Sequence, residues 1–99
     1  MESGGYVYIV TNKNKTVLYI GVTSRLMHRI HQHKTKHFQN SFTARYNCDR
    51  LVYYEGFQSI VEAIIREKKL KGTNRKKKES LINGFNPNWV DLFDTLEIY

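Results

Sequence analysis

The chain has 99 residues, and its 16 basic and 9 acidic side chains give a formal net charge of +7 at pH 7. A hydrophobic fraction of 40% is ordinary for one folded domain, expected here over residues 1–99, and excludes an intrinsically disordered chain. The longest apolar run, Tyr6 to Val10, is too short to span a membrane. The excess positive charge favours a polyanionic partner: nucleic acid, an acidic protein or an anionic membrane surface.

The cysteine content and the N-terminus indicate the compartment. The single cysteine, Cys48, cannot form an internal disulfide, and the N-terminus lacks the basic-then-apolar layout of a secretory signal. The expected location is therefore cytoplasmic.

A β-hairpin is predicted at the start of the chain. Residues Gly5 to Thr11 and Thr16 to Val22 are rich in β-branched and aromatic side chains, which favour strands. The residues between them are polar and turn-forming. Ser24 is then the expected N-cap of a helix that runs to about Lys36.

The second half of the chain predicts one more strand and further helices. The strand is expected over Leu51 to Phe57, and a helix from Ile60 to about Leu70 follows it between a Ser59 cap and Gly72.

Thr73 or Asn74 caps the next predicted helix, which reaches about Asn83, and Pro87 can open a short last helix. The predicted order is thus β-β-α-β-α-α(-α). This is an α+β fold in which a small three-stranded antiparallel sheet, the hairpin plus the third strand, is flanked by three to four helices.

Glu67 is the most informative local anomaly. At helical spacing it falls within the apolar arc of its helix, an arc formed by Ile60, Ala63, Ile64 and Leu70. A carboxylate there either reaches water or pairs with Lys71, four residues on, or it points into a cleft where it can bind a divalent metal. The pattern alone leaves both interpretations open.

Two further groups of side chains are candidates for a site. Arg29 and His33 lie four residues apart and share a helix face, and an Arg fork matches a phosphate. Tyr8 and Tyr19 lie on the hairpin, where a half-buried aromatic sheet face is the plainer interpretation. Gly21 could let a ligand approach the backbone closely.

Taken together, these residues resemble the GIY-YIG nuclease superfamily, in particular its small stand-alone bacterial members. The second signature triplet is intact as Tyr19-Ile20-Gly21. The first reads Tyr6-Val7-Tyr8, so its leading glycine is missing and its tyrosine is Tyr8. The chain is similar to the family from about Tyr6 to Leu92, nearly its whole length.

The remaining family positions follow in order. Arg29 matches the family arginine, His33 a histidine found in several members, and Glu67 the family glutamate. Asn86 or Asn88 would match a C-terminal asparagine, so Asn86 is kept as a structural or site residue.

The resemblance implies metal-dependent hydrolysis of DNA phosphodiester bonds, in repair or recombination. Glu67 would ligate a single Mg²⁺ or Mn²⁺, and Arg29 would stabilise charge on the phosphate. Tyr8 would position or deprotonate the attacking water, which requires a strongly lowered pKa caused by the metal or Arg29. Tyr19 would position phosphate or water, and His33 would assist proton transfer.

Half of the basic residues form one run between Arg66 and Lys78. This run is either a solvated helix exterior or a surface that follows a nucleic-acid backbone. The residues assigned to nucleic-acid binding are Gly21, Lys68, Lys71, Arg75, Lys76, Lys77 and Lys78.

Two alternatives to an endonuclease stay open. The degenerate first triplet also suits a non-catalytic module that binds DNA or RNA on the same scaffold. A third possibility is an interaction protein whose basic face docks an acidic partner. Nucleic acid, with DNA as the expected kind, is the predicted partner; no membrane association is expected, and a protein partner could supply targeting.

Overall fold

Strand-favouring segments form one antiparallel sheet at the centre of the molecule. The structure is a computed structural model that describes residues 4–96, so the first and last three residues of the predicted domain lie outside the described part. Its strands are β1 (Gly5–Thr11), β2 (Leu18–Thr23) and β3 (Arg50–Phe57), in the spatial order β2-β1-β3. The third strand pairs with β1, which makes the hairpin's first strand the central one.

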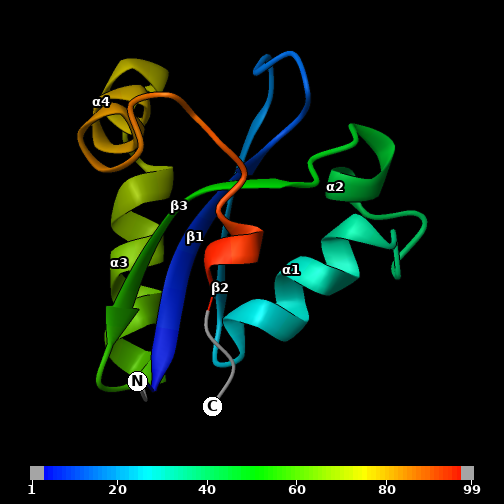
Figure 1. Cartoon of the computed structure of the whole chain (residues 1–99). Helices are drawn as coiled ribbons and strands as arrows, with labels where there is room; N and C mark the ends of the chain where they lie inside the picture. The colour runs from blue at the N-terminus through cyan, green and yellow to red at the C-terminus, as the bar shows by residue number, and fades with distance from the viewer. Residues whose placement is uncertain (1–3, 97–99) are drawn as a thin grey trace.

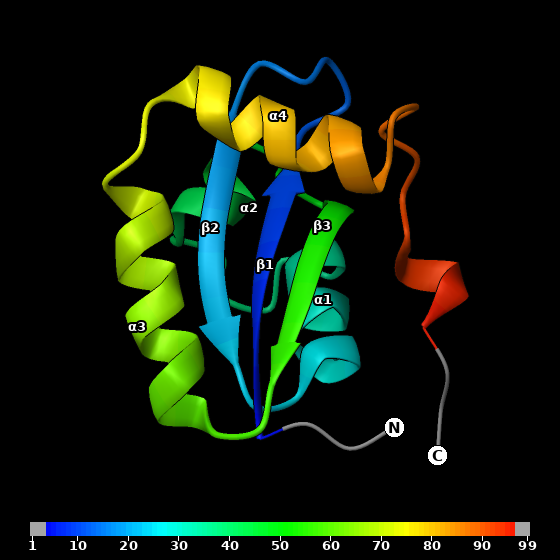
Figure 2. The ribbon, with the colours of Figure 1, turned by 90° about the vertical axis from the view of Figure 1, so that its left-hand side faces the viewer.

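Helices cover both faces of this sheet (Figures 1 and 2). On one face lie α3 (Ile60–Lys71) and α4 (Arg75–Phe85), and on the other lie α1 (Leu26–Lys34) and α2 (Phe42–Arg45). The predicted α+β class and element order are confirmed, with α2 as an additional short helix. No helix within residues 4–96 is long and apolar enough to cross a bilayer.

The alternation of side chains along β1 divides the core into two halves. Val7 and Ile9 point toward α3 and α4, whereas Tyr8 and Val10 point toward α1. The half beside α1 consists of buried Tyr8, Val10, Leu26, Ile30, Cys48 and Leu51. Tyr8 brings a hydroxyl into this otherwise hydrophobic cluster, and the site is built around it.

Local side-chain contacts shift several predicted boundaries. The strand predicted from Thr16 begins at Leu18 because the Asn12 carboxamide oxygen accepts hydrogen bonds from the N–H groups of Thr16 and Val17, at 2.8 and 3.1 Å. The Asn12 side chain thereby holds the end of the loop in a turn.

The first helix begins later and ends earlier than predicted. Ser24 is not its N-cap; that position is Arg25, which makes no side-chain cap bond. The Thr23 hydroxyl accepts from the Arg25 N–H at 3.0 Å, which satisfies that donor in a local turn. The helix ends at Lys34, before Lys36 with its positive φ of 53°.

The later helices differ mainly at the C-terminal end. Ser59 and Asn74 are the N-caps of α3 and α4, and α4 continues through Gly84 to Phe85. The short helix expected at Pro87 is wrong: a turn occupies that position, and a short 3₁₀ helix η1 (Phe93–Thr95) follows later.

Asp91 fastens this last segment to the α1 face of the sheet. Its carboxylate pairs with Lys34 of α1 and accepts the Leu51 N–H of β3 at 3.1 Å. The Leu92 N–H also donates to the Leu51 carbonyl at 2.8 Å. The segment around Asp91 and Leu92 therefore runs beside β3, away from β2.

Candidate active site

The centre of the candidate site is the contact between Tyr8 and Gly21. The two residues lie directly opposite each other on β1 and β2. The Tyr8 ring is fully buried, and a Cβ on Gly21 would lie 2.3 Å from its hydroxyl oxygen. Gly21 does not have a positive φ, so what it supplies is space. Tyr8 itself occupies the space beside Gly21 on this face of the sheet, and the approach of a ligand to the Gly21 backbone stays a prediction.

A buried chain of hydrogen bonds extends from Tyr8 to α2. The Tyr8 hydroxyl lies 2.8 Å from His33 Nε2, and His33 Nδ1 lies 2.9 Å from Thr43 Oγ1. Burial lowers the pKa of His33 to about 4, and the Arg29 charge adds to this effect. His33 is therefore neutral at pH 7, so one ring nitrogen donates and the other accepts.

The pKa of Tyr8 shows which charged groups surround its hydroxyl. Burial raises the pKa of Tyr8 to about 12, which outweighs the opposing effect of the Arg29 guanidinium; Tyr19 and Glu67 add to the rise. Arg29 thus acts on the Tyr8 pKa in the expected direction, but burial outweighs it, so the net lowering expected for Tyr8 does not occur. Tyr8 and Tyr19 both lie against the His33 ring, with ring centres 5.5 and 6.0 Å from it.

The guanidinium of Arg29 has an N–H group that makes no hydrogen bond. Its Nε is buried without a hydrogen-bond partner, and no bond of regular geometry joins it to Tyr8. Its Nη1 donates to Gln32 at a long 3.3 Å, and the guanidinium lies 5.6 Å from the centre of the Phe38 ring. A buried, unpartnered N–H on a permanent cation marks a place where an anionic oxygen can bind.

Glu67 reaches this region from α3. Its side chain is 13% exposed, and one carboxylate oxygen lies 3.1 Å from Lys71 Nζ. The pairing with Lys71 is therefore confirmed, and the metal-binding role of Glu67 stays a prediction.

The residues present fit a hydrated divalent ion. Within residues 4–96 no group of three acidic, His or Cys side chains lies close enough to enclose a metal. Glu67 is then the carboxylate available to such an ion, and waters and phosphate oxygens must complete its shell. That ligand set is typical of Mg²⁺, which keeps much of its water and is held by one or two carboxylates.

An open cavity of about 230 Å³ lies beside Tyr19, where β2, α2, α3 and α4 meet. Two of the predicted nucleic-acid-binding residues, Lys71 and Lys78, contribute to it. Its lining consists of Leu18, Tyr19, Ile20, Phe42, Lys71 and Lys78. Lys68, Lys76 and Lys77 are exposed on the helices and are not among the lining residues.

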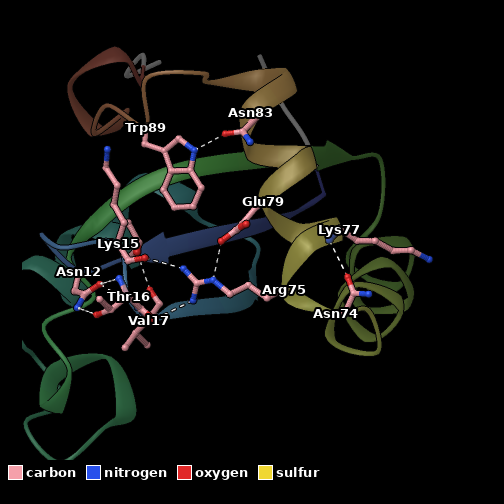
Figure 3. Close-up of polar contacts among 11 residues, drawn as sticks. Asn12, Lys15, Thr16, Val17, Asn74, Arg75, Lys77, Glu79, Asn83 and Trp89 are labelled. Carbon is pink, nitrogen blue, oxygen red and sulfur yellow. Dashed lines mark hydrogen bonds and ion pairs between the residues drawn. The ribbon is translucent and has the colours of Figure 1, made fainter.

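Arg75 has a structural task in the folded chain. Its guanidinium donates to the carbonyls of Lys15 and Thr16, at 2.7 and 2.9 Å, and to the Glu79 carboxylate at 2.8 Å (Figure 3). These bonds tie α4 to the hairpin loop. They engage three of the five N–H groups of Arg75, and its assignment to nucleic-acid binding stays a prediction.

Asn86 is structural. It is buried, and its amide donates to the carbonyls of Val52 and Val90 at 3.2 and 2.8 Å. Its oxygen accepts the Val90 N–H at 3.2 Å, so the side chain holds the turn after α4 against β3.

Sequence reasoning missed two residues of the site, both on α2. Thr43 completes the chain from Tyr8, and Phe42 stacks on Tyr19 with the ring centres 5.9 Å apart. The available signal was Ser41, whose hydroxyl caps α2 by accepting the Ala44 N–H at 3.2 Å.

A buried tyrosine packed on a glycine, a guanidinium with an unpartnered N–H and a carboxylate on α3 are features that suit the binding of a phosphate group. The family model described as the GIY-YIG catalytic domain matches residues 4–80. The chain therefore belongs to the GIY-YIG family, a nuclease-type family whose members act on nucleic acid and generally use divalent metals.

Comparison with solved structures agrees with this family assignment. The chain is similar to the UPF0213 protein BH0048 from Bacillus halodurans, whose structure was solved in solution by NMR. The two are 30% identical over 86% of this chain and 88% of that one, with a TM-score of 0.55. Among curated protein sequences, none matches this chain significantly.

Proposed function

We propose that this protein is a divalent-metal-dependent endonuclease that hydrolyses DNA phosphodiester bonds in the cytoplasm, in repair or recombination. The observation that carries the proposal is the packing of Tyr8 and Tyr19 against His33, at 5.5 and 6.0 Å between ring centres, on the helix that also carries Arg29. The free Nε of Arg29 supports a phosphate at this position. The exposed lysines of α3 and α4 support a polyanionic substrate.

In this proposal Glu67 holds Mg²⁺ or Mn²⁺, and the ion would supply Lewis-acid stabilisation of the phosphate and of the leaving oxygen. Arg29, which is half-buried, binds a non-bridging phosphate oxygen through its guanidinium and neutralises charge that builds up there. Tyr19 lines the cavity beside Lys71 and positions the DNA strand there.

Proton transfer runs through the Tyr8–His33 pair. Because the pKa of Tyr8 is about 12, its phenol keeps its proton at pH 7 and cannot accept one unaided. With hydrogen on Nδ1, His33 donates to Thr43 and leaves Nε2 to accept the Tyr8 proton. Tyr8 then takes a proton from the attacking water as its own passes to His33, which requires that the charge of the bound phosphate raise the low pKa of His33. The P–O bond to the leaving oxygen breaks, and that oxygen takes a proton from solvent.

Glu67→Gln tests the proposal, with Glu79→Gln as the matched control. Both glutamates pair with a basic residue four positions later or earlier on the same helix, but only Glu67 lies at the site. We expect Glu67→Gln to reduce cleavage of branched, damaged and single-stranded DNA with Mg²⁺ or Mn²⁺ by about 100-fold or more. Glu79→Gln should cleave like the unaltered protein.

Full activity of Glu67→Gln would refute the assignment of the metal ligand. A protein that binds all of these substrates and cuts none of them would instead be a non-catalytic DNA- or RNA-binding module. Cleavage that appears only with an added protein would show that targeting depends on a partner.

A further inference from the structure

The short helix α2 carries aromatic side chains that the fold leaves in solvent. Phe42 is 47% exposed and Tyr46 is 46% exposed, one helical turn apart. Their ring centres lie 4.7 Å apart, so they form one surface. Phe42 also stacks on Tyr19 at an interplanar angle of 28°. A row of three rings therefore runs from the candidate active site out to solvent.

Positive charge lies beside this row. Phe42 and Tyr19 line the same open cavity as Lys71 and Lys78. The Lys71 side chain is 52% exposed and lies next to the Glu67 carboxylate. A phosphate in the cavity would thus lie near both the lysines and the exposed face of Phe42.

This combination of rings and charge selects one class of ligand. Aromatic side chains stack on nucleobases whose faces are free, and lysines attract the adjoining phosphates. In a duplex each base face is already covered by its neighbours, so only an unpaired nucleotide can use such a surface. An apolar protein partner would not need the flanking lysines.

We propose that Phe42 and Tyr46 form a stacking platform for an unpaired nucleobase beside the bound phosphate, so that the preferred substrate is single-stranded at the point of cleavage. The proposal rests on the proposed nuclease function for the identity of the bound phosphate. It adds a specificity-determining surface to that function, on an element that lies outside the signature triplets.

The test measures binding without cleavage, in EDTA, with the full chain. The probes are a short single-stranded DNA that contains 2-aminopurine and a duplex of the same sequence. We expect Phe42→Ala to weaken single-strand binding by about 5- to 100-fold and duplex binding by less than about 2-fold. Quenching of 2-aminopurine emission by the unaltered protein should be lost in the variant.

Phe85→Ala is the matched control, because Phe85 is 48% exposed but packs on Tyr53 and Tyr54 of β3. It should bind both probes like the unaltered protein, and Phe42→Tyr should keep the preference because its ring remains. Unquenched 2-aminopurine emission in the complex with the unaltered protein would overturn the proposal whether or not Phe42→Ala folds.

Other outcomes separate this proposal from the nuclease function. If the protein cuts DNA but Phe42→Ala keeps full single-strand preference, the platform is wrong and the nuclease assignment stands. If it cuts nothing but Phe42→Ala loses single-strand affinity selectively, the platform stands alone. A dimer that dissociates on Phe42→Ala would mean that a second copy covers these rings, which also overturns the platform.

Discussion

At the residue scale, Gly21 shapes the candidate site because glycine has no side chain. Gly21 leaves the space in which the Tyr8 hydroxyl lies, and a Cβ there would be 2.3 Å from that oxygen. The neighbouring Tyr8 ring is fully buried and cannot move aside easily. We therefore expect Gly21→Ala to displace Tyr8 from His33, to reduce cleavage strongly, and to lower the free energy of unfolding by about 1–3 kcal/mol, as overpacking does. Urea unfolding and a nicking assay measure both effects.

Gly84→Ala is the control for this substitution. Gly84 lies inside α4, and a Cβ there would meet nothing within 4 Å. Alanine should raise stability by about 0.5–1 kcal/mol, because it favours the helix. Equal stability and activity for Gly21→Ala and the unaltered protein would show that Tyr8 is not held by this contact.

The sequence predicts which residues belong to the candidate site, but it does not predict their surroundings. Tyr8, Tyr19, Arg29 and Glu67 are recognisable because they follow in the family's order and spacing. The raised pKa of Tyr8 was not foreseeable, since it comes from burial by segments distant in the chain.

At the element scale, Arg75 joins α4 to the β1–β2 loop. Its guanidinium donates hydrogen bonds to the carbonyls of Lys15 and Thr16, which would otherwise accept hydrogen bonds from water (Figure 3). Because Arg75 is partly exposed, we expect Arg75→Met to cost only on the order of 1 kcal/mol of stability. Hydrogen exchange should accelerate locally in residues 12–17.

Lys76→Met provides the comparison, since it removes a neighbouring exposed cation from the same helix. It should leave both stability and exchange in the loop unchanged. An equal effect of the two substitutions would mean that general charge on α4, and not the Arg75 fork, stabilises the loop.

Elements with regular patterns were predictable, and elements set by single contacts were not. The β1 strand and α3 follow from residue type and periodicity. The four-residue helix α2 is too short to show a period, and only the Ser41 cap indicates it. The C-terminal segment follows Asp91, whose partners lie on α1 and β3.

At the scale of the whole molecule, His33 should make stability depend on pH. Burial keeps the folded-state pKa of His33 at about 4, whereas an exposed histidine titrates near 6.5. Between these values the unfolded chain binds a proton that the folded chain does not, so stability should fall as the pH falls from about 6.5 to about 4. Between pH 7 and 4.5 the loss should be roughly 2 kcal/mol.

Comparison with His33→Gln isolates this contribution, because all carboxylates titrate in both proteins. Urea unfolding at pH 7 and 4.5 should show a smaller loss of stability in the variant by roughly that amount. Identical losses in both proteins would mean that His33 is not buried as a neutral ring.

The sequence by itself determined the class of fold, the order of the elements and the family positions Tyr8, Tyr19, Arg29 and Glu67. These depend on local propensity, periodicity and spacing, which a linear chain already contains. Only the tertiary structure decided how polar groups are used: Arg75 and Asn86 bind backbone carbonyls, while Arg29 keeps a free N–H. Which hydrogen-bond donors remain available to a ligand depends on contacts that form only when distant segments of the chain pack together.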